Sequence, residues 1–190
     1  MNLKLLAEQV IARIGGPAGG GTSDKLELLD IVRMRREPRV YEKNWAPFVD
    51  NGAIRFMYRP GHVVNDTGQD ISKVDPPFAV GHFAGSGGLI KILGYWMGII
   101  HEARYHLGTP HRYYQHRFML YDEKDYRVRA ISKPFVFNDK VIEFAAGLAH
   151  HPKENKIVIS YGWKDCEARI ATVKLSEVME FIWHEGQRSE

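Results

Sequence analysis

The sequence predicts a mainly β fold with one short helix at each end, and three observations support this expectation. Short apolar or alternating segments recur between turn residues from residue 25 onward, which is typical of a β-sandwich, barrel or propeller. The strand–turn–strand units repeat roughly every 50 to 60 residues, a spacing that suits propeller blades. The chain has 190 residues, of which 44% are hydrophobic and 12% aromatic, so it can bury a substantial core.

The first 24 residues are expected to form a helix and a linker. Apolar side chains spaced by three and four predict a helix over residues 2–14, and they are Leu3, Leu6, Val10 and Ile14. Residues 15–24, GGPAGGGTSD, have the composition of a flexible linker. These glycines do not predict a phosphate-binding loop, because no Lys-Ser or Lys-Thr follows them at the required spacing. We therefore divide the chain into a helix with its linker, 1–24, and a β domain with a C-terminal helix, 25–190.

Seven segments of the β domain have the pattern of strands. They are residues 27–34, 53–59, 89–93, 96–106, 112–122, 156–162 and 168–175. The end of the chain differs, because its apolar residues form a single helical stripe that predicts a helix over 176–184. That stripe consists of Leu175, Val178, Met179 and Ile182.

Composition argues against several functional classes. The formal net charge is only +3 and the basic residues form no long block, so nucleic acid is not an expected partner. The longest apolar run, residues 92–100, is too short to span a membrane. The single cysteine cannot form an internal disulfide, which favours a reducing, cytoplasmic location. The nine histidines show no spacing that converges on a metal, so we expect no metal site.

Two segments stand out for their polar chemistry. In "EKNW", Lys43 can contact an anion, Asn44 can bind hydroxyls and Trp45 can pack on a sugar ring; the alternative is a solvated lysine beside a core tryptophan.

In "IIHE", His101 can donate to an anion or a sugar oxygen. Glu102 can be an acid, a base or a partner for Arg104, and the alternative is a strand that emerges into solvent. Cys166 is interpreted as a small buried apolar residue.

Several motifs resemble glycoside hydrolase family 130, the mannoside phosphorylases and their relatives. The matching segments are EKNWAPFVDNGAIRFMYRP, GYWMGIIHEARY and IEFAAGLAHHPKENKIVISYGWKDCEARIATVKLSEV. The resemblance covers about residues 28 to 182. It is greater still to uncharacterised bacterial propeller domains, some of which are fused to glycosyltransferases. It implies blades of a five-bladed β-propeller with a sugar site at the mouth of the central channel.

The resemblance also implies roles for individual residues. Lys43 matches a phosphate-contacting lysine, His101 matches a histidine of the site, and Asp165, with Tyr161 beside it, matches a sugar-contacting acid. A structural aspartate that caps its own turn is the alternative for Asp165. Tyr58 stands where the family has the histidine of a His-Arg-Pro motif, which weakens the phosphate site. Inorganic phosphate is the only co-substrate implied, and no other cofactor is expected.

The sequence accounts for about three blades, and the segment that carries the general acid in the family has no counterpart before Lys43. Glu102 and Glu143 are the only weak candidates for a proton donor. The favoured function is a carbohydrate-binding or accessory module that serves a glycosyltransferase. The alternatives are a glycosidase or mannoside phosphorylase completed by a partner chain, and a degenerate fragment without activity. An open arc of blades would leave exposed flanks, so we expect a homo-oligomer or a partner chain.

Overall fold

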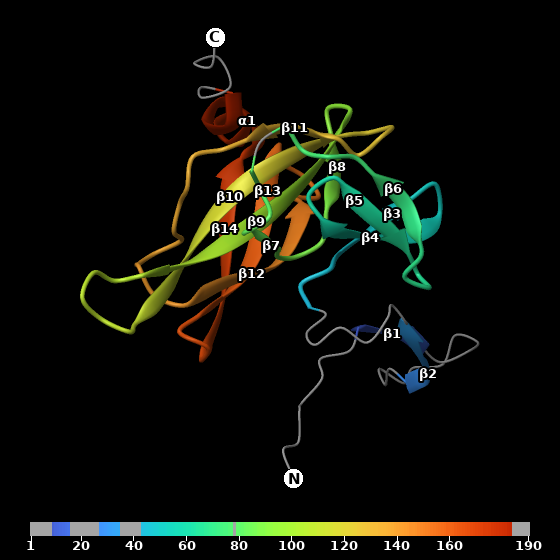
Figure 1. The fold of residues 1–190 in the computed structure, drawn as a ribbon, viewed down its shortest axis with the longest axis horizontal. Helices are drawn as coiled ribbons and strands as arrows, with labels where there is room; N and C mark the ends of the chain where they lie inside the picture. The colour runs from blue at the N-terminus through green and yellow to red at the C-terminus, as the bar shows by residue number, and fades with distance from the viewer. Residues whose placement is uncertain (1–8, 16–26, 35–42, 78, 184–190) are drawn as a thin grey trace.

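The computed structural model describes residues 9–15, 27–34, 43–77 and 79–183. Within this part the chain is mainly β, with a single short helix, α1 (Leu175–Trp183), near its end. The seven predicted strand segments and the C-terminal helix are confirmed to within one or two residues at each end. Three sheets of consecutive strands and a separate hairpin make up the fold (Figure 1).

The predicted N-terminal helix is wrong for the residues that can be compared. Gln9–Gly15 forms strand β1, which pairs antiparallel with β2 (Glu27–Met34). The β-branched residues Val10, Ile11 and Ile14 favour an extended chain once a partner strand is available. Residues 2–8 of the predicted helix, and most of the predicted linker, lie outside the described residues.

The first sheet is a four-stranded meander. Its strands are β3 (Ala46–Asp50), β4 (Ala53–Arg59), β5 (His62–Asn65) and β6 (Asp70–Lys73), in that order. The turn between β3 and β4 is Asn51-Gly52, and both residues have positive φ angles, 48° and 78°. This combination gives the two-residue turn whose twist matches a hairpin, and it sets Asp50 opposite Ala53.

The second sheet is built on a long hairpin and lies between the other two. Its strands are β7 (Ala84–Gly85), β8 (Ile90–Ile92), β9 (Tyr95–Tyr105), β10 (Arg112–Asp122) and β11 (Val128–Ile131). Alternate residues of β9 enter two different cores: Trp96 and Ile100 pack with the first sheet, whereas Met97 and Ile99 pack with the third. Burial of both faces explains why residues 96–100 form a continuous apolar run rather than an alternating one.

The third sheet contains β12 (Glu143–His150), β13 (Lys156–Trp163) and β14 (Glu167–Lys174). Helix α1 follows directly and buries Leu175, Val178 and Ile182 in the core shared by the second and third sheets. Strand β12 was not predicted from its pattern, because its alanines and glycine have weak strand propensity. No helix in the described part of the chain has the length and apolar character needed to cross a membrane.

Candidate functional site

The segment that contains Lys43 and Asn44 lies directly against the second sheet. Gly85 of β7 approaches the Asn44 backbone so closely that a Cβ atom there would overlap the Asn44 carbonyl oxygen. Asn44 takes a left-handed conformation with φ of 64°, which asparagine tolerates better than most residues. The neighbouring residue of β7, Ala84, is paired with His101 of β9. The tertiary fold thus brings Lys43 and Asn44 beside His101.

His101 is buried, with 6% of its surface exposed. Its Nδ1 lies 2.9 Å from the Oγ of Ser86, which is also buried. The rings of Tyr114 and Phe144 lie 5.0 and 5.3 Å from the imidazole. Burial, and then the positive charge of Lys43, lower the pKa of His101 to about 4. The imidazole is therefore neutral at pH 7 and offers a hydrogen bond rather than a fixed positive charge.

His116, a histidine that the sequence analysis did not place in the site, is paired with His101 across β9 and β10. It is fully buried, and its ring centroid lies 6.3 Å from that of His101 and 4.8 Å from that of Phe137. Neither ring nitrogen makes a hydrogen bond of good geometry to any described residue. Burial and the neighbouring His101 lower the pKa of His116 to about 3, and the nearby Glu143 backbone opposes them. Only the pairing of β9 with β10 reveals this neighbour.

Glu102 belongs to the opposite face of β9, as expected from strand alternation. Its carboxylate is 5% exposed and lies 3.0 Å from the Nη2 of Arg104. The Nε2 of His82 lies 3.6 Å from the same carboxylate. Of the three roles left open for Glu102, namely an acid, a base or a partner for Arg104, the contacts show the ion pair with Arg104. Arg104 and His82 hold the carboxylate on the side of the first sheet.

Glu143, the second candidate for a proton donor, has a different local role. Its side chain is fully buried and accepts hydrogen bonds from three consecutive backbone N–H groups. The donors are Phe137 at 2.7 Å, Asn138 at 2.9 Å and Asp139 at 3.2 Å. The carboxylate thus pairs with backbone N–H groups of the loop before β12 that would otherwise be buried without an acceptor. This argues for a structural role of Glu143.

Two aromatic residues that were expected to bind sugar lie in the core. Trp45 is 5% exposed and contacts Phe56 and Tyr58 edge-on, with centroid distances of 6.0 and 5.2 Å. Tyr161 is 7% exposed and stacks on Phe137 at 4.2 Å, with its hydroxyl 3.2 Å from the side-chain amide of Asn138. Neither ring presents a free face, so the alternative of a core tryptophan describes Trp45 better.

Asp165 lies at the tip of the hairpin between β13 and β14. Lys164 and Asp165 both have positive φ angles, 53° and 55°, and the N–H of Cys166 donates to the Trp163 carbonyl at 3.2 Å. Two consecutive positive φ angles define the tight hairpin turn that usually contains Asn-Gly, and aspartate tolerates this conformation. The side chain of Asp165 makes no hydrogen bond or ion pair to a described residue. Asp165 therefore belongs to the backbone of the turn, but its side chain does not cap that turn as the structural alternative supposed.

The expectation for Cys166 is corrected by the same turn. Its side chain is exposed rather than buried, because the residue completes the turn outside the core. The thiol Sγ lies 3.7 Å from the carbonyl oxygen of Trp163. Cys166 therefore does not pack behind Asp165.

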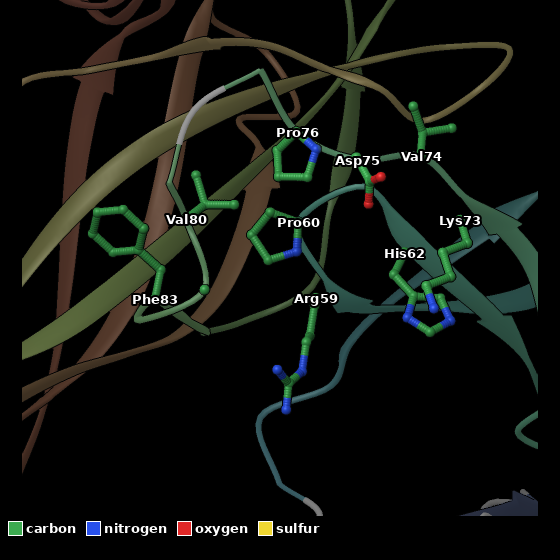
Figure 2. A pocket seen from close by; sticks show the side chains of 10 residues that line it. Arg59, Pro60, His62, Lys73, Val74, Asp75, Pro76, Val80 and Phe83 are labelled. Carbon is green, nitrogen blue, oxygen red and sulfur yellow. The ribbon is translucent and has the colours of Figure 1, made fainter.

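A hollow of about 170 Å³ lies beside the first sheet, and none of the predicted site residues lines it. Figure 2 shows Pro60 and Pro76 facing each other, with Val80 and Phe83 on one side and His62 and Lys73 on the other. His62 is hydrogen-bonded to Asp70, with 2.8 Å between its Nε2 and the Oδ1 of the carboxylate. Within the described residues, no cluster of three or more potential metal ligands occurs.

Comparison with solved structures finds a beta-1,2-mannobiose phosphorylase from Listeria innocua, in its complex with beta-1,2-mannobiose. The two structures share a TM-score of 0.54 at 16% sequence identity, and the alignment covers 83% of this chain and 51% of the phosphorylase. The chain thus spans about half the length of this relative. No family model and no curated protein matches the sequence. The chain therefore has a β fold similar to part of a glycoside phosphorylase.

Proposed function

We propose that the chain is a carbohydrate-binding module with a partial propeller fold, in which the three sheets are three blades. The observation that carries this proposal is the placement of Lys43 and Asn44 against β7, beside the neutral His101. The similarity of the fold to a mannobiose phosphorylase supports a carbohydrate as the ligand.

The three side chains offer complementary contacts to a sugar. The exposed Lys43 contributes an ammonium group that can bind a hydroxyl or a phosphate. Asn44 can both donate and accept hydrogen bonds. His101 has one nitrogen near Ser86, which leaves the other available for a hydroxyl. Tyr114, half-buried beside His101, adds an aromatic surface at the edge of this group.

The carboxylates favour binding over catalysis. Glycoside cleavage needs a proton donor for the leaving oxygen. Glu143 is occupied by three backbone donors and Glu102 by Arg104, so neither is placed as a free acid. We therefore propose that the chain serves as an accessory module, for instance to a glycosyltransferase. A second candidate, a glycosidase or mannoside phosphorylase completed by a partner chain, is favoured by the half-length alignment.

Calorimetric titration with mannose and β-1,2-mannobiose, with and without inorganic phosphate, tests the proposal. We expect binding of a mannoside to the wild type, and loss of at least about fivefold in affinity in Lys43→Ala, which corresponds to one lost polar contact. Lys153→Ala, an exposed lysine at the β12–β13 turn, is the matched control and should bind as the wild type does. Absence of binding to every sugar would refute the proposal. Phosphate-dependent release of mannose 1-phosphate, lost in Lys43→Ala, would instead select the second candidate.

A further inference from the structure

The hairpin of β9 and β10 extends beyond the candidate site. Both strands have 11 residues, and their pairing runs without a break from Asp122 opposite Tyr95 to Arg112 opposite Tyr105. Figure 1 shows the hairpin projecting past the neighbouring sheets. The segment before β12 supports it from the side, because the N–H of Tyr114 donates to the Val141 carbonyl at 3.1 Å. The projection is therefore a braced part of the fold.

One face of this hairpin continues the surface that contains His101. Residues opposite one another in an antiparallel pair share a face, and the face recurs every second residue. Tyr114 is opposite Ala103 and Arg112 is opposite Tyr105, so these side chains follow His101 in one row. Contacts confirm the row: the Tyr114 ring lies 5.0 Å from His101, and the Arg112 guanidinium lies 5.8 Å from the Tyr114 ring. We call Tyr105, Arg112 and Tyr114 the hairpin platform.

The other face of the hairpin has different contacts. Tyr113 is covered by His106, at 4.9 Å, and by Lys140, at 5.9 Å from its ring. Tyr105, by contrast, is 65% exposed. The platform is thus the face on which aromatic surface is open to a ligand, and it begins where the candidate sugar site ends.

The charge of the hairpin selects an anionic ligand. Residues 103–117 contain three arginines and three histidines but no aspartate or glutamate. Arg104 is paired with Glu102 on the other face. No carboxylate of the described residues pairs with Arg112, so its guanidinium can take a carboxylate or phosphate of a ligand through two parallel hydrogen bonds.

We infer that the hairpin platform binds an acidic glycan, whose sugar rings pack on Tyr114 and Tyr105 and whose anionic group contacts Arg112. Tyr105 and Tyr114 are offset by two residues along the hairpin, or about 7 Å, so the ligand has to be longer than a disaccharide that occupies the Lys43–His101 site. This inference rests on the proposed function, since it extends the same site. A glycan fits better than a lipid surface, because Leu107 is the one fully exposed aliphatic side chain at the tip.

The test compares three glycans of equal length by calorimetry at low salt. They are a hexamer of β-linked mannuronic acid, a mannohexaose that bears phosphate groups, and neutral mannohexaose. We expect either acidic hexamer to bind at least about fivefold more tightly than the neutral one. Arg112→Gln should abolish that difference, and Tyr105→Ala should weaken the hexamers about fivefold while leaving β-1,2-mannobiose unaffected. Which acidic hexamer binds more tightly identifies the anionic group as carboxylate or phosphate.

Two matched variants control for charge and for exposure. Lys140→Gln removes the same charge from the opposite face, and Leu107→Ser changes an exposed tip residue outside the platform; both should bind the acidic hexamers as the wild type does. Equal loss in Lys140→Gln and Arg112→Gln would overturn the inference, as would tighter binding to oligothymidylate or to phosphatidylglycerol vesicles. Hexamer binding that depends on Arg112 without any binding of mannobiose would retain the platform and refute the function proposed for Lys43 and His101.

Discussion

The replacement Glu143→Gln separates a structural carboxylate from a catalytic one. In the folded chain, Oε2 accepts from Phe137 and Oε1 accepts from Asn138 and Asp139. A glutamine at this position keeps one acceptor oxygen for two of the donors. Its amide group then faces the remaining N–H, and both are donors. We therefore expect a loss of stability without a change of shape.

The magnitude follows from the number of bonds that are lost. A hydrogen bond to a charged acceptor contributes about 1.5 to 3 kcal/mol, and a buried donor left without a partner costs about 1 to 3 kcal/mol. Because the amide keeps two of the three bonds in weaker form, we expect the free energy of unfolding to fall by about 2 to 3 kcal/mol. For a denaturant slope of about 2 kcal/mol per molar, the urea midpoint should fall by roughly 1 M.

Urea unfolding followed by tryptophan fluorescence measures this shift, and an exposed glutamate provides the control. Glu154 forms an exposed ion pair with Lys156, so Glu154→Gln should leave the midpoint unchanged within error. A midpoint for Glu143→Gln equal to that of the wild type would refute the structural assignment. Mannoside phosphorolysis by the wild type that disappears in a fully folded Glu143→Gln would reassign the residue to catalysis.

Three further predictions concern the site and its surroundings. The pKa values of His101 and His116, about 4 and about 3, lie below the unfolded value; the unfolded chain therefore binds more protons, and the free energy of unfolding should fall by up to about 1.4 kcal/mol per histidine for each pH unit below 6.5. His116→Phe should reduce this slope in urea titrations at several pH values and raise stability at pH 7; an unchanged slope would contradict it. Gly85→Ala should destabilise the fold by about 2 kcal/mol and weaken sugar binding, because its Cβ displaces Asn44; a stable variant with normal affinity would disprove this docking. Cys166 is the only cysteine and is exposed, so a thiol reagent should label one group per folded chain. If the thiol reacted only after the chain unfolds, the exposed position of Cys166 in the turn would be wrong.

The pattern of apolar residues predicted most of the long strands and the final helix. Strands β9, β10, β13 and β14 have enough β-branched and aromatic residues to be recognised locally. Shorter strands such as β7 and β11 could not be predicted, because two to four residues hold no periodicity and exist only through pairing with β9 and β10. The N-terminal helix was mispredicted for a related reason: its spacing suited a helix, but strand β2 supplied a partner, and tertiary pairing overrides helix propensity.

The amino-acid sequence by itself determined that the chain is mainly β, with a C-terminal helix, and it drew attention to the polar side chains of the EKNW and IIHE segments. These properties are local, because strand periodicity and side-chain chemistry can be read within a few neighbouring residues. Only the tertiary structure decided that Lys43 and Asn44 lie beside His101, that Trp45 and Tyr161 are core residues, and that Cys166 is exposed. The physical reason is that burial and electrostatic neighbours depend on which sheets pack together. Those contacts join residues that are distant in the chain, such as Asn44 with Gly85 and Lys43 with His101, beyond the reach of any local pattern.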